Sequence, residues 1–270
     1  MSDPFLWLTP FKESDNLYLR HLHEIIASFI IYEVVISRRL APWINKMVFG
    51  RNYTQIKDKN TRLNFDIHTV SMAQCIVSLS LTYPILFSPL SLDLVTYSDP
   101  YTSMVSAVTI GYFLWDLYVC LKHFNLFGVG FLGHALASLY VFVLSLRPFC
   151  QPWIGKFLIF ELSTPFVNVN FYVSQLTKLS GKSVVPMWFN ALNGVMLILT
   201  FFVVRILWGF TAIIILCKKL WVARDRLPWW IPVTVLILNF SLDALNVFWL
   251  MKMIKIAQKM LNGDARSKRH

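Results

Sequence analysis

Apolar residues in this chain gather into long runs, each about the length that an α-helix needs to cross the hydrocarbon core of a bilayer. Polar or basic stretches separate the runs, so the pattern predicts about seven transmembrane helices. Their expected ranges are residues 21–37, 66–87, 102–121, 128–146, 153–173, 186–217 and 231–254. The first range is the weakest, because Glu24 and Glu33 interrupt it. The range 186–217 predicts either one long tilted helix or a crossing followed by a shorter segment.

Several runs carry polar residues that recur every three or four positions, and such residues share one face of an α-helix. The members of these stripes are His68, Ser71 and Gln74; Glu161, Thr164, Pro165 and Asn168; Asn190 and Asn193; and Asn239, Asp243 and Asn246. Asp116, His134 and Arg205 are further ionisable residues within apolar runs. An ionisable group in hydrocarbon costs at least a few kcal/mol, so it normally faces other helices or an internal cavity. We therefore expect the stripes to point inward and to meet in a common polar centre.

Composition supports an integral membrane protein. Of the 270 residues, 56% are hydrophobic and only 14% are charged, whereas soluble domains are about 25% charged. The net charge of +11 lies mainly in loops and tails, where basic residues determine topology and meet anionic lipids. We therefore expect membrane lipids as partners and no nucleic acid. The basic stretches 38–62 and 255–270 predict a lumenal N-terminus and a cytosolic C-terminus, although the basic residues of 218–226 then fall on the lumenal side.

Soluble-enzyme and metal-site motifs are missing from the sequence. The four cysteines form no CxxC and no metal-ligand spacing, so we expect no disulfide framework, no metal site and no cofactor. No GxSxG, HExxH or P-loop occurs. The first residues lack a basic segment followed by an apolar core, which predicts that no cleavable signal peptide is present.

The intramembrane polar residues have both a structural and a functional interpretation. His134 either hydrogen bonds across a helix interface to Asp116 or Glu161, or it performs a function. Asp116 is expected to pair with a histidine or with Arg205. Pro165 is expected to kink its helix and to free a carbonyl oxygen that a neighbouring group satisfies. The intramembrane asparagines are expected to join helices rather than to bind ligands.

Six segments, taken in order, resemble the motifs of the TLC domain, which is shared by translocating-chain-associating membrane proteins, ceramide synthases and the ceroid-lipofuscinosis membrane protein. They are FDIHTVSMAQ at 65–74, GYFLWDL at 111–117, Gly133-His134, ELSTPFVN at 161–168, Phe202 with Arg205, and Asn246 with Trp249. The resemblance covers residues 60–257, between an N-terminal part at 1–59 and a basic tail at 258–270. It implies an all-α polytopic bundle around a lipid-sized cavity, located in the endoplasmic reticulum membrane.

The departures from the family motifs favour a branch that does not synthesise ceramide. Gly133 stands where ceramide synthases have the first of two adjacent histidines. A later His-Asp-x-x-Asp motif of those enzymes falls on residues 161–165, where its acids are replaced. The resemblance therefore implies a protein that binds or regulates lipids in membrane homeostasis. The alternative is an N-acyltransferase in which His134 is the general base and Asp116 orients its imidazole.

The candidate residues for a lipid-binding polar cavity are His68, Gln74, His134, Glu161, Thr164, Asn168 and Arg205. Under the acyltransferase alternative, acyl-CoA and a sphingoid base would be substrates. A second copy of the chain or another membrane protein is a further candidate partner, and an escort role for membrane proteins is a weaker third hypothesis.

Overall fold

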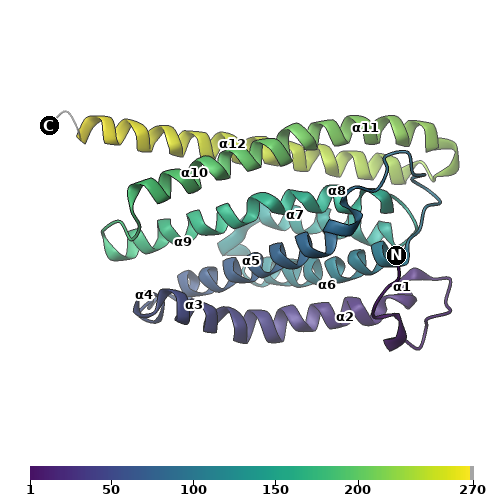
Figure 1. Cartoon of the computed structure of the whole chain (residues 1–270), viewed down its shortest axis with the longest axis horizontal. Coiled ribbons are helices and arrows are strands. Elements are labelled where there is room, and N and C mark those ends of the chain that lie inside the picture. Colours follow the sequence, from purple (N-terminus) through teal and green to yellow (C-terminus); the bar gives the residue numbers. More distant parts are fainter. Residues whose placement is uncertain (268–270) are drawn as a thin grey trace.

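The computed structural model describes residues 1–267, with side chains to residue 258, and in this range it contains helices and no strands. The helices form an elongated bundle with roughly parallel axes (Figure 1). The α-helices are α1 (Leu17–Arg20), α2 (Leu22–Ile30), α3 (Ala41–Phe49), α4 (Arg51–Thr54), α5 (Lys59–Leu86), α6 (Pro100–Lys122), α7 (Phe124–Ser145), α8 (Ile154–Leu158), α9 (Thr164–Ser180), α10 (Met187–Phe201), α11 (Trp208–Ala223) and α12 (Trp230–Ser267). The expected all-α membrane bundle is confirmed.

Short 3-10 or π segments join several of these helices end to end. The π segments are η2 (Ile31–Leu40) and η5 (Phe202–Leu207), and the 3-10 segments are η1 (Leu6–Leu8), η3 (Gln151–Trp153), η4 (Ile159–Ser163) and η6 (Arg224–Arg226). Through η5, helices α10 and α11 continue as one helix. The long apolar run 186–217 is therefore a single helix, which leaves no room for a hidden extra crossing.

Five helical segments within the described residues are long and apolar enough to cross a membrane. They are Lys59–Leu86, Pro100–Lys122, Phe124–Ser145, Met187–Arg226 and Trp230–Gln258. The segments α2–α3 and α8–α9 lie in the same bundle (Figure 1), but Glu24 and Glu33 interrupt the first and the 3-10 turn η4 interrupts the second. The number of seven crossings stays a prediction.

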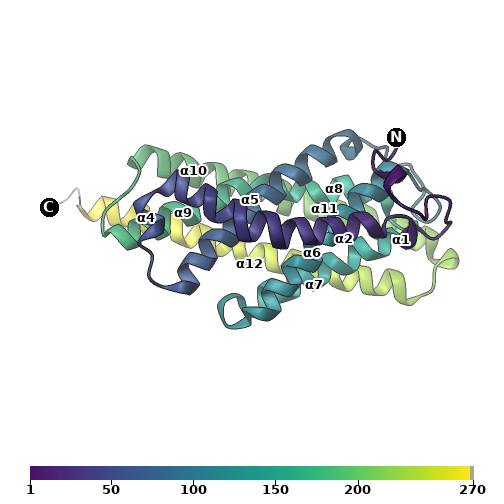
Figure 2. The ribbon, with the colours of Figure 1, turned by 90° about the horizontal axis from the view of Figure 1, so that it is seen from below.

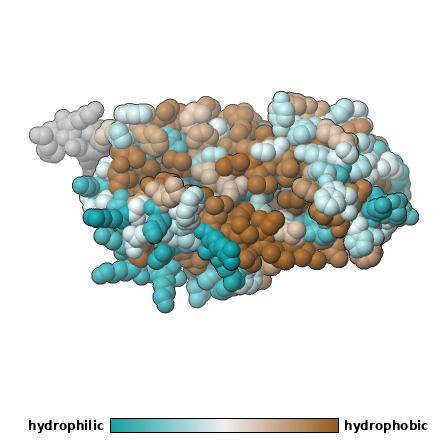
Figure 3. Space-filling view, turned by 60° about the horizontal axis from the view of Figure 1, so that its bottom comes forward, coloured by the Kyte–Doolittle hydropathy of each residue, from teal (hydrophilic) through white to brown (hydrophobic). Residues whose placement is uncertain are grey.

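Consecutive long helices run in opposite directions along the bundle (Figures 1 and 2). The basic connection around α4 therefore lies at the same end as the C-terminal part of α12. The basic tail expected at 258–270 continues α12 to residue 267, while its side chains from 259 and residues 268–270 lie outside the described part. Between the two polar ends, a broad apolar surface is visible (Figure 3).

Two of the basic residues that contradict the charge rule have partners in a neighbouring loop at the opposite end of the bundle. Arg226 forms an ion pair with Asp93 at 2.6 Å, and the Lys219 ammonium donates to the Leu92 carbonyl oxygen at 3.1 Å. Both partners belong to the loop between α5 and α6. These contacts tie the end of α11 and the segment η6 to that loop, which gives the two basic residues a structural role at this end.

Helix α6 is central to the fold, since it packs against both α2 and α7. At its contact with α2, the Ser28 hydroxyl donates to the Val108 carbonyl oxygen at 2.7 Å. A Cβ atom added at Gly111 would lie 2.5 Å from the Ile25 carbonyl oxygen and from the Ser28 Cβ. The two helix backbones approach so closely because position 111 has no side chain.

We expect Gly111→Ala to lower the free energy of unfolding by about 1–3 kcal/mol, because the added methyl group overpacks the α2–α6 contact. The matched control is Gly194→Ala in α10, where an added Cβ meets nothing within 4 Å. Thermal unfolding in detergent would show a lower Tm for the first variant only. Equal Tm values for both variants would contradict the close contact.

The ion pair between Asp93 and Arg226 depends on pH through the Asp93 carboxyl. The Arg226 guanidinium and the Val95 and Thr96 amides hold the pKa of the Asp93 carboxyl well below its usual range. A depressed pKa means that Asp93 stabilises the loop fully above its unfolded-state pKa of about 3.9 and loses this effect as the pH falls below that value. We expect Asp93→Asn to speed amide hydrogen exchange at residues 92–97 at pH 7. The increase should be modest, because the ion pair is exposed.

The control for this experiment is Asp225→Asn, since the Asp225 side chain is 81% exposed and lies 3.6 Å from Arg224. High salt should reduce the difference between wild type and Asp93→Asn. If Asp225→Asn speeds exchange at residues 92–97 to the same extent, the Asp93–Arg226 pair does not hold this loop.

Candidate functional site

The helical segment α8–α9 is interrupted where the sequence predicts a kink. Pro165 has no N–H, so the carbonyl oxygen four residues earlier, that of Glu161, loses its helical partner. The chain adopts the 3-10 turn η4 there, and Pro165 stands in the first turn of α9. The Cys75 thiol on α5 donates to the Glu161 carbonyl oxygen at 3.1 Å. The helix is therefore interrupted before Pro165 and the freed carbonyl oxygen is satisfied by a neighbouring helix, as expected.

A cavity of about 80 Å³ lies beside this turn, between α7, η4, the η5–α11 helix and α12. Its lining combines aromatic and aliphatic walls with polar groups: Phe113, His134, Ser138, Val141, Phe142, Phe157, Leu158, Phe160, Glu161, Arg205, Gly209, Asn239, Leu242 and Asp243. Ligand pockets usually measure roughly 300–1,000 Å³. The cavity is thus smaller than the lipid-sized one that the resemblance implies, because large aromatic side chains fill the space between the helices.

Arg205 is the one arginine in the cavity lining. Its Nε donates to the Ser163 hydroxyl at 3.1 Å, and its guanidinium carbon lies 5.3 Å from the centre of the Phe201 ring. Within the described residues, the two terminal guanidinium nitrogens have no hydrogen-bond partner, and no carboxylate lies within 4.0 Å of them. The side chain is therefore held at one nitrogen while its planar fork remains available to a ligand.

Two acids line the same cavity. The Thr164 hydroxyl donates to Glu161 Oε2 at 2.7 Å, which orients that carboxylate. Asp243 on α12 is 7% exposed. A Cβ atom added at Gly209 would lie 3.3 Å from Asp243 Oδ1, so the glycine lets α11 approach this carboxylate. The cavity thus brings one guanidinium and two carboxyl groups together within apolar walls.

His134 faces the cavity from α7, between aromatic rings. Its ring centre lies 6.4 Å from Phe113 and 6.1 Å from Trp249, both edge to face. Its Nδ1 atom is buried and has no hydrogen-bond partner among the described residues. The interhelical hydrogen bond considered for His134 is thus not made in this structure.

The Asp116 side chain lies outside the cavity. It does not line the cavity, and within the described residues its carboxylate is approached by the Cys120 thiol, with Sγ 3.9 Å from Oδ1. No hydrogen bond joins it to His134 in this part of the chain. The pairing of Asp116 with a histidine or with Arg205, which the sequence suggested, is absent from the described residues because position 116 lies outside this cavity.

Two further polar groups lie between other helices. His68 Nδ1 donates to Asn168 Oδ1 at 2.7 Å, and the His68 ring stacks on Phe171 at 3.6 Å. The Asn168 amide also donates to the Ser71 hydroxyl at 3.4 Å, which joins α5 to α9. In the second group, the Tyr32 hydroxyl of η2 donates to Gln74 Oε1 of α5.

The expected common centre is therefore divided. The cavity brings together His134, Glu161 and Arg205, with Thr164 bonded to Glu161, whereas His68 with Asn168 and Gln74 with Tyr32 form separate helix contacts. Ser138, Asn239 and Asp243 line the cavity as well, although they are not among the candidate site residues. The acidic residue Asp243 within an apolar segment is the sequence feature that could have identified this part of the cavity lining.

One protein family matches most of this chain. The family profile described as the TLC domain matches residues 64–255. Topoisomerase I damage affected protein 4 of Saccharomyces cerevisiae is 48% identical over 268 residues, which cover 99% of this chain and 95% of that protein. An uncharacterized TLC domain-containing protein of Schizosaccharomyces pombe is 34% identical over 92% of this chain and 82% of its own length. Human TLC domain-containing protein 4 is 27% identical over 86% of this chain and 84% of its own length. No solved structure matches significantly.

The carbonyl contact beside the cavity can be tested with two substitutions of Cys75, which is 1% exposed. Cys75→Ala removes the donor to the Glu161 carbonyl oxygen, and Cys75→Ser retains one. We expect Cys75→Ala to lower the free energy of unfolding by about 1 kcal/mol more than Cys75→Ser, because a buried acceptor is left without a partner. Chemical or thermal unfolding in detergent measures the difference. A serine variant less stable than the alanine variant would show that the thiol is only a packing group.

Proposed function

Because the chain belongs to the TLC-domain family, we propose that it binds the headgroup of a membrane lipid in the cavity beside η4 and thereby takes part in membrane lipid homeostasis. The membrane character of the protein and its family are established by the helices and by the profile match over residues 64–255. The relatives named above are not ceramide synthases. The proposal therefore concerns binding or regulation rather than ceramide synthesis.

The observation that carries the proposal is the free guanidinium fork of Arg205 inside a small cavity with apolar walls. Arginine binds phosphate and carboxylate groups with two parallel hydrogen bonds, and it does so more strongly where water is excluded. The carboxylates of Glu161 and Asp243 line the same cavity and suit an amine or a quaternary ammonium of the same headgroup. A phosphate-containing headgroup with a positive end, on a glycerol or sphingoid backbone, is the best chemical match.

The acyl chains would lie outside this cavity, because about 80 Å³ holds only a headgroup. The outer faces of the neighbouring helices are apolar and exposed, as Leu136 on α7 and Phe240 and Phe248 on α12 illustrate. Hydrocarbon chains could pack against these faces while the headgroup enters between α7 and α12. Such an arrangement leaves the chains within the bilayer.

The acyltransferase alternative has less support in the geometry. A general base needs its imidazole oriented by a hydrogen bond to its other nitrogen. His134 Nδ1 has no partner among the described residues, and the carboxylate of Asp116 approaches Cys120. Acyl transfer from acyl-CoA to a sphingoid base therefore remains the second candidate.

We propose the endoplasmic reticulum membrane as the location, with the C-terminal tail in the cytosol. The family resemblance supports the organelle. The basic residues in the connection around α4, at the same end of the bundle as the end of α12, support the orientation by the positive-inside rule.

Lipid binding can be measured by native mass spectrometry of the purified chain in detergent, incubated with phosphatidylcholine or with ceramide. We expect the wild type to retain phosphatidylcholine in preference to ceramide, which lacks the phosphate. Arg205→Gln should reduce the retained phosphatidylcholine roughly tenfold or more, since a charge-assisted hydrogen bond contributes about 1.5–3 kcal/mol. The matched control is Arg224→Gln, because the Arg224 side chain is 50% exposed at the end of the bundle.

Equal retention by wild type and Arg205→Gln would contradict a headgroup site at this cavity. Formation of N-acyl product from acyl-CoA and a sphingoid base, abolished in His134→Ala, would instead support the acyltransferase alternative.

A further inference from the structure

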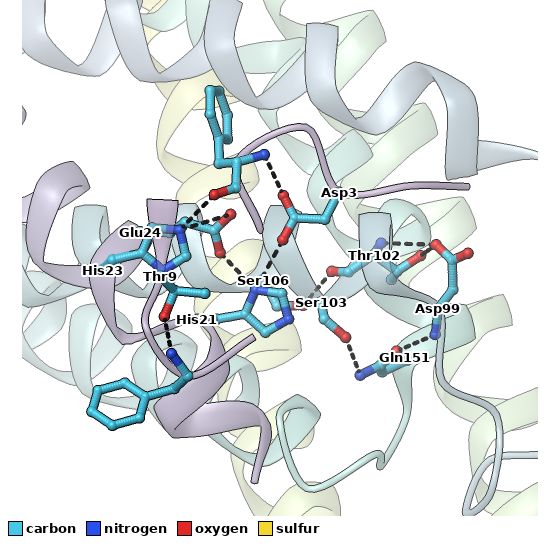
Figure 4. A network of polar contacts seen from close by, with 12 residues as sticks. Asp3, Thr9, His21, His23, Glu24, Asp99, Thr102, Ser103, Ser106 and Gln151 are labelled. Carbon is cyan, nitrogen blue, oxygen red and sulfur yellow. Dashed lines mark hydrogen bonds and ion pairs between the residues drawn. The ribbon is translucent and has the colours of Figure 1, made fainter. Parts of the chain in front are cut away.

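A separate cluster of chemically active side chains lies at the end of the bundle where the N-terminal segment meets α2. Asp3, His21 and Glu24 each turn a ligand atom toward the others, and these atoms all lie within 4.8 Å of one another (Figure 4). All three side chains are buried, with exposed fractions of 0%, 1% and 3%. This cluster lies apart from the cavity beside η4.

The local structure explains how Asp3, His21 and Glu24, which form no recognised sequence motif, come together. Asn16 caps α1, and its side chain accepts from the Tyr18 amide at 2.9 Å. Helix α1 ends at Arg20 and α2 begins at Leu22. His21 lies between them as the N-cap of α2, three positions before Glu24 in the first turn. The segment before α1 folds back and brings Asp3 onto them. Asp3 Oδ1 accepts from the Phe5 amide at 2.8 Å, which leaves Oδ2 directed at His21.

The charges of this cluster do not balance. His21 Nδ1 lies 3.5 Å from Asp3 Oδ2 and 2.6 Å from Glu24 Oε2. Among the described residues, no lysine or arginine nitrogen lies within 4.0 Å of either carboxylate, and the nearest other base is His23, 3.9 Å from Glu24 Oε1. Even a protonated His21 would leave one buried negative charge.

The cluster also contains unpaired atoms. Asp3 Oδ2 and Glu24 Oε1 are both enclosed and have no hydrogen-bond partner in the described part of the chain. A buried carboxylate oxygen without a partner is costly. Protonation of one acid would remove the excess charge. A bound cation would balance the charge and coordinate the carboxylates.

We propose that Asp3, His21 and Glu24 bind a divalent transition-metal ion, with Zn²⁺ as the best match. Imidazole nitrogen and carboxylate oxygen are both zinc ligands, at about 2.0–2.2 Å, which places the ligand atoms of a tetrahedral site roughly 3.3–3.5 Å apart. The 3.5 Å between His21 Nδ1 and Asp3 Oδ2 fits this spacing. Glu24 Oε2 would move away from its present hydrogen bond with Nδ1 to take its place. Three protein ligands leave the fourth position to water.

Oxygen-selective cations match the cluster less well. Ca²⁺ takes six to eight oxygen ligands, and Mg²⁺ requires octahedral oxygen coordination, whereas one of three donors here is a nitrogen. Zinc would fasten the N-terminal segment to the start of α2, because Asp3 is separated from the other two ligands by the whole of that segment. Binding would thus stabilise the folded end of the bundle.

The test uses the full chain purified through an affinity tag without histidine and treated with a chelator. Calorimetric titration with Zn²⁺ in detergent should show one tight site in the wild type. The double variant Asp3→Asn/Glu24→Gln should weaken this binding at least tenfold. The matched control, Glu13→Gln/Asp15→Asn, changes the charge equally at two exposed positions of the same N-terminal segment and should bind as the wild type does.

Thermal unfolding tests the site in the wild-type protein as well as in the variants. Zn²⁺ should raise the Tm of the wild type and of the control, and it should leave the Tm of Asp3→Asn/Glu24→Gln unchanged. The single variant Asp3→Asn lies before every α-helix, so it tests the site even if the change at Glu24 disturbs α2. The proposal is overturned if Asp3→Asn and the double variant both bind Zn²⁺ as tightly as the wild type. It is also overturned if Ca²⁺ or Mg²⁺, but not Zn²⁺, raises the wild-type Tm.

Discussion

Hydrocarbon offers no hydrogen-bond partner, so each polar group inside this bundle has to be satisfied by the protein or by a ligand. This constraint accounts for the contacts that join the helices. The carbonyl oxygen freed by Pro165 accepts from Cys75, and His68 donates to Asn168 across α5 and α9. Such contacts fix the register between neighbouring helices. The same constraint makes any polar group that lacks a partner informative.

Two of the places where described polar groups lack a partner differ in chemistry. In the cavity beside η4, the free fork of Arg205 lies with Glu161 and Asp243 among aromatic side chains. At the end of the bundle, Asp3 and Glu24 surround an imidazole without a neighbouring strong cation. The first arrangement suits a headgroup with charges of both signs, and the second suits a metal ion. The two sites share no residue.

Secondary structure at the cavity is irregular for a physical reason. Pro165 cannot donate the hydrogen bond that a continuous helix needs, and η4 takes the tighter 3-10 form just before it. On the facing helix, the π segment η5 contains Arg205. Such local departures from α geometry often accompany functional sites in helices. They turn polar side chains into a space that two straight helices would close.

Apolar periodicity in the sequence determined the all-α class and the long helices, and the Pro165 motif determined where one of them is interrupted. The stripe of Glu161 and Thr164 was also predictable, because residues three apart on a helix share a face. Tertiary packing decided which stripes meet. It divided the expected polar centre, left Asp116 outside the cavity and added Asp243 to it. It also brought Asp3 to His21, a contact that no local spacing predicts, since only the fold of the N-terminal segment sets the distance between them.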